Sequence, residues 1–328
     1  MTAARSALRS HTTSRKGVGG GWWQAWWPRL RLALTVLFFG AVAVLLVISA
    51  REVEWQKVAG VIGGYGTGTL LIAAGLAAVG HVLYTTYDLM GRRYTGHELP
   101  WPRVVRIAFV SYAFNLNMGP IIGAIGFRFR LYSLFGLNKE TIGRVLGFSI
   151  VSNWLGYLLL GGVLFASRVV ELPPAWAIGT AALQMLGAGM ILIVVTYLTW
   201  CARAKRRSFR VRSVAVELPP LRVALLQLAA SCASWLTIGA ILFALLQQQI
   251  AFPTVMGVLL LAAVAALATH IPAGLGVLEA TFVLLLGHVL PRVELLAAVL
   301  AYRVFYYLLP LAVALPVFLL LEAKAKRT

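Results

Sequence analysis

Long apolar runs, separated by short polar segments, dominate the hydrophobic pattern of the chain. A transmembrane helix needs about 20 apolar residues, and six runs reach about that length. They cover residues 30–50, 69–90, 144–166, 177–200, 221–246 and 295–321. The pattern therefore predicts an all-α polytopic membrane protein with about six full spans.

Two further apolar segments are interrupted by proline and glycine. The first, 104–126, runs into GPIIGAIGFR at 119–128, and the second consists of short arms at 254–268 and 277–290 around HIPAGLGVLEA at 270–280. Irregular backbone is tolerated at membrane depth only where protein buries it or a watery cavity meets it. We predict two broken or re-entrant helical hairpins. The alternative for the second segment is a tight turn between two membrane helices. The residues expected to break the helices are Gly119, Pro120, Gly123, Gly126, Pro272, Gly274 and Gly276.

Basic residues alternate with neutral loops along the chain. Segments 92–106, 128–144 and 203–212 are strongly basic, whereas 51–57 and 168–174 carry little net charge. The positive-inside rule then places both termini in the cytoplasm. It makes the hairpin near residue 120 face inward and the one near residue 272 face outward. Opposite orientation with similar breaks suggests an inverted repeat.

Composition excludes a soluble protein. The 328 residues are 60% hydrophobic and 12% charged, against about a quarter charged in soluble domains. The net charge of +19 would suggest nucleic acid in a soluble protein, but here the bases lie between spans, where topology and anionic headgroups explain them. We expect residues 1–28 to be a basic disordered tail with an interfacial tryptophan segment, 29–323 the transmembrane domain, and 324–328 a basic cytoplasmic tail.

Three charged residues close to the breaks or within a span are the strongest binding candidates. Arg128 and Glu279 follow the two breaks, and Arg303 lies in the last span. A charge at the centre of a span costs about 2.5–3.5 kcal/mol, so these side chains are not expected to face lipid. Forked guanidinium groups and helix N-termini suit a phosphate. The alternatives are a structural Glu279–Arg303 salt bridge and ordinary positive-inside charge at Arg128.

Other polar residues in apolar surroundings complete the predicted substrate site. They are Asp88, Asn115, Asn117 and Asn153. For Asp88 the alternative is an ion pair with Arg92, four residues on. For the three asparagines the alternative is a structural role, because side-chain amides often form hydrogen bonds between membrane helices.

Catalytic motifs are missing from the chain, and two cysteines are too few for a metal site or a disulfide framework. We therefore expect no catalytic residue, no cofactor and no metal. The remaining enzyme hypothesis places His97, Glu98 and Asp88 at the cytoplasmic edge, acting on lipid-linked substrates.

Several stretches resemble the lysylphosphatidylglycerol synthase membrane-domain family in its standalone, YbhN-like inner membrane form. They are YDLMGRRYTGH at 87–97, SYAFNLN at 111–117, GAIGFRFRLYS at 123–133, SNWLGY at 152–157, HIPAGLGVLEA at 270–280 and AYRVFYYLLP at 301–310. The resemblance implies a bacterial inner membrane protein with two lobes and re-entrant helices. It marks Gly123, Gly126, Arg128, Pro272, Gly274, Gly276, Glu279 and Arg303. In relatives with an added cytosolic domain, that domain aminoacylates phosphatidylglycerol and the membrane part moves the lipid between leaflets. The short segment after the last span leads us to expect no such domain here.

The leading hypothesis is a phospholipid transporter or flippase that binds a charged, anionic or zwitterionic, headgroup between the two hairpins. A transporter of a small soluble anion and a non-catalytic assembly partner remain open. Phospholipids and the membrane are the expected partners, nucleic acid is not, and a homo-oligomer stays open.

Overall fold

The computed structural model describes residues 54–169, 179–205, 207–211, 214–269, 271 and 274–325. The predicted tail 1–28, the first span at 30–50 and Pro272 lie outside these residues. The described part belongs to one compact unit, Glu54–Thr328, and all that follows concerns this unit.

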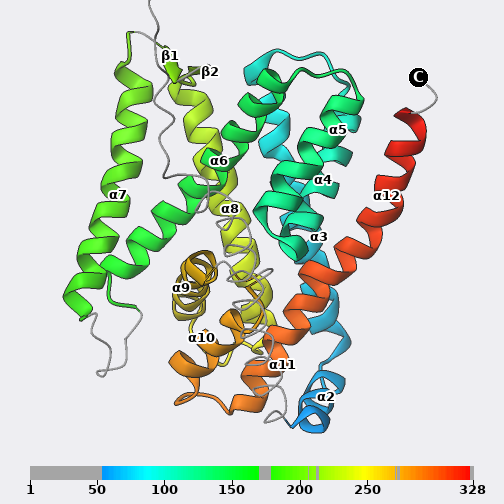
Figure 1. Ribbon diagram of the computed structural model, residues 1–328. Coiled ribbons are helices and arrows are strands. Elements are labelled where there is room, and N and C mark those ends of the chain that lie inside the picture. Colours follow the sequence, from blue (N-terminus) through cyan, green and yellow to red (C-terminus); the bar gives the residue numbers. More distant parts are fainter. Residues whose placement is uncertain are drawn as a thin grey trace, which may run out of the picture. The chain divides into compact units, whose positions relative to one another are not determined.

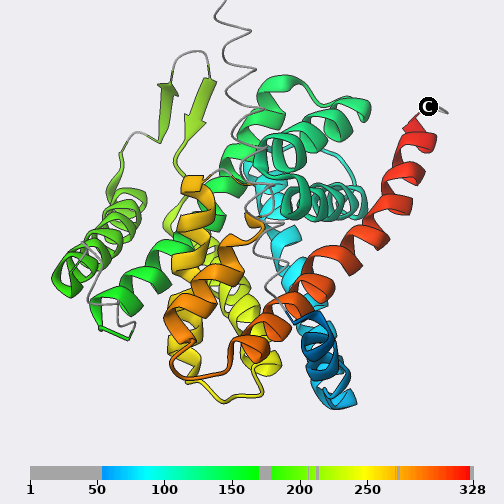
Figure 2. The ribbon, with the colours of Figure 1, turned by 60° about the horizontal axis from the view of Figure 1, so that its bottom comes forward.

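Helices make up nearly all of the described part (Figures 1 and 2). In chain order they are α2 (Trp55–Gly63), α3 (Thr67–Thr95), α4 (Trp101–Met118), η1 (Pro120–Phe127), α5 (Arg128–Leu134), α6 (Lys139–Ala166), α7 (Thr180–Arg203), α8 (Leu221–Leu245), α9 (Phe252–Thr269), α10 (Val277–Leu286), α11 (Arg292–Arg303), η3 (Val304–Leu308) and α12 (Leu309–Ala325), where η1 and η3 are π-helical.

Six described helical segments are long and apolar enough to cross a membrane. Five of them, α3, α6, α7, α8 and the continuous α11–η3–α12, coincide with predicted spans. The sixth is α9, which the sequence pattern treated as a short arm of the second hairpin, at 254–268. That expectation was wrong: α9 has 18 residues, which at 1.5 Å per residue reach about 27 Å, close to the hydrocarbon thickness.

The segment after α3 folds into an antiparallel helical hairpin. α4 ends at Met118, Gly119 turns the chain with φ +82°, and η1 returns against α4. Contact is close at Gly123, where an added Cβ would lie 2.2 Å from the Asn115 Cα. Only Gly119 breaks the helix here. Pro120, Gly123 and Gly126 lie inside η1, which runs directly into α5.

A second hairpin joins α9 to α10, and the two helices lie side by side in both ribbon views (Figures 1 and 2). Gly274 and Gly276 adopt positive φ, +57° and +79°, which a residue without a Cβ adopts at little cost. In Figure 1 the first hairpin lies in the upper part of the bundle, around α4, and the second lies in the lower part, around α9 and α10. Whether either one enters the membrane and returns stays a prediction.

A short β-hairpin in the basic loop after α7 was not predicted. β1 (Ser208–Val211) pairs antiparallel with β2 (Val214–Glu217). The Tyr94 hydroxyl, near the end of α3, accepts from the Glu217 backbone N–H at 2.9 Å and contacts the Glu217 carbonyl. This contact fixes the β-hairpin to the end of α3.

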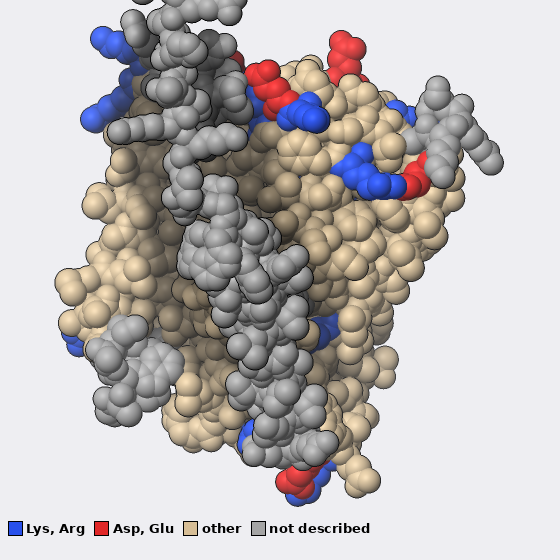
Figure 3. Space-filling view, viewed as in Figure 1, with Lys and Arg blue, Asp and Glu red and all other residues tan. Residues whose placement is uncertain are grey.

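α8 is the central helix of the bundle, in contact with α3, α6, α7, α9 and α11. Its approach to α6 is close because Gly156 has no side chain, and the Gly156 N–H donates to the Ser231 hydroxyl at 2.9 Å. On the face shown in Figure 3 the charged side chains gather at the two ends, and the zone between them is nearly all uncharged. Many large apolar side chains are exposed, among them Ile121, Leu192 and Leu320, as expected for lipid-facing helices.

The close approach at Gly123 gives a direct test of the first hairpin. Gly123→Ala places a methyl group against α4 backbone and should cost about 1–3 kcal/mol, the usual range for overpacking. Gly126→Ala is the matched control, because the atom nearest to a Cβ added at Gly126, the Ile121 carbonyl oxygen, would be 3.5 Å away. Thermal unfolding in detergent should show a lower melting temperature for Gly123→Ala alone, and equal values for the two variants would contradict the packing described.

Candidate functional site

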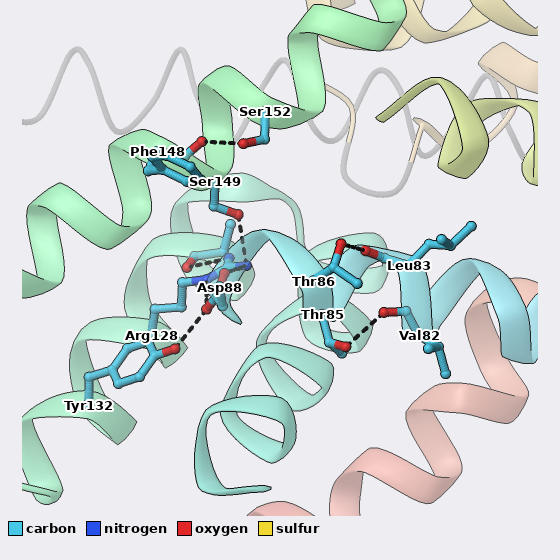
Figure 4. A network of polar contacts seen from close by, with 11 residues as sticks. Val82, Leu83, Thr85, Thr86, Asp88, Arg128, Tyr132, Phe148, Ser149 and Ser152 are labelled. Atoms are coloured by element: carbon cyan, nitrogen blue, oxygen red, sulfur yellow. Dashed lines mark hydrogen bonds and ion pairs between the residues drawn. The ribbon is translucent and has the colours of Figure 1, made fainter. Parts of the chain in front are cut away.

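A bidentate ion pair buried between three helices anchors the first hairpin (Figure 4). Arg128, the first residue of α5, donates from Nε to Asp88 Oδ2 and from Nη2 to Oδ1, both at 3.0 Å. The Tyr132 hydroxyl donates to Oδ2 at 2.9 Å. Arg128 also donates to the Ala124 carbonyl at 3.3 Å and to the Ser149 hydroxyl at 3.4 Å. The cluster ties η1 and α5 to α3 and α6.

Burial makes this pair a structural lock. The Arg128 side chain is 1% exposed and that of Asp88 0%. Removing one partner of such a pair typically costs about 3–5 kcal/mol, because the other charge is left uncompensated. The sequence offered Arg92 as the partner of Asp88. Instead, Arg92 Nε donates to the Leu99 carbonyl at 2.6 Å and holds the turn after α3.

A second bidentate pair joins the second hairpin to the last span. Arg303 Nε donates to Glu279 Oε1 at 2.5 Å and Nη2 donates to Oε2 at 3.1 Å. Nη2 also donates to the Gly274 carbonyl at 2.8 Å, inside the break itself. The salt bridge that the sequence left open as an alternative is therefore present. It is less enclosed than the first, since the side chains are 9% and 16% exposed.

Both arginines sit where α-helix and π-helix meet. Arg128 directly follows η1, and Arg303 directly precedes η3. A π-helical turn widens the helix by one residue and is found frequently at functional sites. Each hairpin is thus held to the bundle through a guanidinium group placed at an irregular point of a helix.

A row of stacked tyrosines, which the sequence did not suggest, connects the two ion pairs. The Arg128 guanidinium lies 5.6 Å from the Tyr84 ring centroid, and Tyr84 stacks on Tyr112 with centroids 3.5 Å apart. The Tyr112 and Tyr306 hydroxyls are hydrogen-bonded at 2.8 Å. Tyr306 in turn stacks on Tyr302 at 5.5 Å. We call Tyr84, Tyr112, Tyr306 and Tyr302 the tyrosine row.

The row ends beside the second pair. Tyr302 contacts Tyr307 edge-on at 5.6 Å, and the Arg303 guanidinium lies 5.4 Å from the Tyr307 ring. His81 packs against the row, 4.9 Å from Tyr306, and its Nδ1 donates to the Ala77 carbonyl at 2.9 Å. The recurrence of tyrosine beside charge in YTTYD at 84–88 and YRVFYY at 302–307 is the signal that would have revealed the row.

The three predicted asparagines have different surroundings. Asn117, near the tip of the first hairpin, donates to the Ala113 carbonyl at 2.8 Å and to the Tyr307 carbonyl at 3.2 Å, so it reaches η3. Asn115 has a buried side-chain oxygen without a hydrogen-bond partner in the described part. Asn153 contributes its backbone carbonyl, which accepts from Ser231 and Trp235, and no hydrogen bond between described residues links it to either ion pair.

The cytoplasmic-edge enzyme hypothesis finds little support in this geometry. Asp88 is fully buried and paired, while Glu98 is exposed. His97 lies 6.1 Å from the Tyr132 ring, and burial together with the charge of Arg92 lowers its pKa. Among the residues that the structure describes, no group of three or more His, Cys, Asp or Glu side chains is placed to hold a metal ion.

Comparison with known proteins identifies the family. The profile of the lysylphosphatidylglycerol synthase TM region matches residues 30–314. The chain belongs to the lysylphosphatidylglycerol synthase TM region family. The resemblance inferred from the motifs is therefore confirmed, and the chain is an integral, multi-pass membrane protein of this family.

The relatives of this chain include proteins of similar length and much longer proteins. Inner membrane protein YbhN of Escherichia coli K12 is 46% identical over 304 residues, covering 92% of this chain and 96% of the relative. An uncharacterized protein of Synechocystis is 29% identical over 299 residues, 88% of this chain and 92% of the relative. Phosphatidylglycerol lysyltransferase of Staphylococcus haemolyticus is 24% identical over 257 residues, 75% of this chain and only 28% of the relative.

The first ion pair can be tested as a structural lock. Asp88→Asn should lower the free energy of unfolding by about 3–5 kcal/mol, because Arg128 is left buried without a counter-charge. The double variant Asp88→Asn with Arg128→Gln should recover part of that loss, because no charge remains buried. Glu54→Gln serves as a surface control, since Glu54 pairs with Lys57 at an exposed site. Equal melting temperatures for Asp88→Asn and Glu54→Gln would contradict the lock.

Proposed function

We propose that the protein moves phospholipids between the leaflets of the bacterial inner membrane, binding a charged headgroup beside the second hairpin. In this proposal the hairpins enter the membrane from opposite sides and both chain termini are cytoplasmic. The chain acts without catalysis. The observation that carries the proposal is the Glu279–Arg303 pair, a partly exposed ion pair at a broken helix within an otherwise apolar bundle.

The contrast between the two ion pairs supports this choice of site. The Asp88–Arg128 pair is sealed, so a headgroup has no access to it. Glu279 is half-buried with its side chain 16% exposed, Arg303 is buried with 9% of its side chain exposed, and the pair sits where α10 begins. Opening this pair exposes a forked cation for a phosphate and a carboxylate for a headgroup amine.

The start of α10 adds a second anion-binding element. Gly276, which has no side chain to cap the first turn, precedes the helix in left-handed conformation. The N–H groups at a helix N-terminus and the helix dipole favour an anion there. The Arg303 guanidinium reaches the same point, because it is bonded to the Gly274 carbonyl. A phosphate held by the first-turn N–H groups and by Arg303 would lie close to the Glu279 carboxylate, which is in the same first turn of α10.

The relatives support a lipid rather than a soluble ligand. The longer relatives carry the name phosphatidylglycerol lysyltransferase, which makes phosphatidylglycerol the first lipid to test here. The exposed apolar side chains near the two breaks, Met118, Ile121, Ile122 and Leu275, are suited to contact with acyl chains. A soluble anion would gain nothing from such surroundings.

A leaflet-exchange assay tests the proposal. Purified protein is reconstituted in vesicles with phosphatidylglycerol that bears a fluorophore on an acyl chain, and an impermeant reductant reports which lipids reach the outer leaflet. We expect faster exchange than in empty vesicles. Arg303→Lys should slow exchange about tenfold, because a charge-assisted forked contact is worth about 1.5–3 kcal/mol.

Arg130→Lys is the matched control for this assay. Arg130 also forms a forked contact with a carboxylate, that of Glu322, but its side chain is 60% exposed at the end of the bundle. The Arg130→Lys variant should exchange lipid at the wild-type rate. No exchange with any common headgroup contradicts the proposal. Uptake of a small anion without lipid exchange would replace it by the soluble-anion alternative.

A further inference from the structure

A cavity separate from both ion pairs lies at the end of the bundle where α8 finishes. Its volume is about 260 Å³, and it opens between the C-terminal end of α2, the turn after α8 and the start of α11. Its polar lining residues are Tyr65, Gln247, Gln249 and Glu294, and its apolar walls include Leu245 and Leu290. We call it the glutamine-turn pocket.

Glu294 supplies the charge of the pocket. It lies in the first turn of α11, where the helix dipole favours an ionised carboxylate. It forms no ion pair with any residue that the structure describes. Arg292, two residues earlier, is exposed and does not pair with it. The half-buried carboxylate therefore lacks a counter-charge within the described residues.

Tyr65 lines the same pocket as this carboxylate. It lies in the turn between α2 and α3 and is 7% exposed. Burial and the nearby Glu294 charge raise its pKa to about 12, so the phenol stays neutral at physiological pH. A neutral phenol offers its oxygen as an acceptor and its ring face to a cation.

The turn that carries the glutamines is strained. Gln247 and Gln248 have φ of +50° and +61°, a conformation that typically costs a side-chain-bearing residue about 1–3 kcal/mol and that persists where surrounding structure enforces it. Backbone bonds from Gln247 to Ala244 and from Gln249 to Leu246 fix the turn. Glycine would make this turn without strain, and glutamine instead brings amide groups to the pocket.

We propose that the glutamine-turn pocket binds a small organic ammonium group. The Glu294 carboxylate provides the counter-charge, the Tyr65 and glutamine oxygens accept hydrogen bonds, and Leu245 and Leu290 cover adjoining methylene groups. The volume lies just below the usual range for small-molecule sites, which suits a compact cation. The cation is a free alkylamine or the amine of a lipid headgroup. This inference does not depend on lipid transport.

Calorimetric titration with ethanolamine hydrochloride tests the proposal on the full-length protein in phosphatidylglycerol nanodiscs. We expect saturable binding that Glu294→Gln weakens at least tenfold and Tyr65→Phe weakens less. Glu54→Gln, which changes an exposed carboxylate paired with Lys57 outside the pocket, should bind like wild type. Thermal unfolding of each variant shows that the fold is kept.

The source of the amine is separated by repeating the titration in nanodiscs that contain phosphatidylethanolamine. Weaker apparent binding there assigns the pocket to lipid headgroups, and unchanged binding assigns it to soluble amines; both support an ammonium site. Equal affinity in wild type and Glu294→Gln overturns the proposal. So does the lack of ethanolamine binding in phosphatidylglycerol nanodiscs.

Discussion

Burying charge in an apolar helix bundle is the constraint on which this structure depends. An isolated ion in such surroundings is strongly destabilising, so each buried charge needs a partner with good geometry. Asp88 with Arg128, and Glu279 with Arg303, meet that need with two contacts each. In both pairs one partner follows a hairpin break and the other lies on a long helix, so electrostatics fixes the hairpins to the bundle.

The two pairs differ in a way that divides their roles. The first is sealed and also bound by Tyr132, which suits a fixed support. The second is partly exposed and bound to backbone at a glycine break, which suits a contact that opens and closes. The tyrosine row joins them through stacking and the Tyr112–Tyr306 hydrogen bond. A change at one hairpin therefore has a packed, hydrogen-bonded route to the other.

Sequence reasoning reached the class of fold and singled out the four charged residues that form the two ion pairs, because apolar run length and isolated charges are visible in one dimension. It paired Glu279 with Arg303 only as an alternative, and it missed Asp88 with Arg128, since 40 residues separate them and a nearer base, Arg92, was available. It also treated Gly123 as a break, although glycine there permits two helices to touch. Ion pairing and close helix packing depend on which residues meet in space. The pattern and spacing of residues along the chain carry little information about that.

An experimental structure of the protein in nanodiscs containing phosphatidylglycerol would test the proposed headgroup site itself. The proposal predicts a lipid phosphate within hydrogen-bonding distance of the Arg303 guanidinium, at the start of α10, with the Glu279 contact loosened or shared. The Asp88–Arg128 pair should stay closed in the same structure. Lipid headgroups bound only at the bundle surface, with the Glu279–Arg303 pair intact in every class of particle, would contradict it.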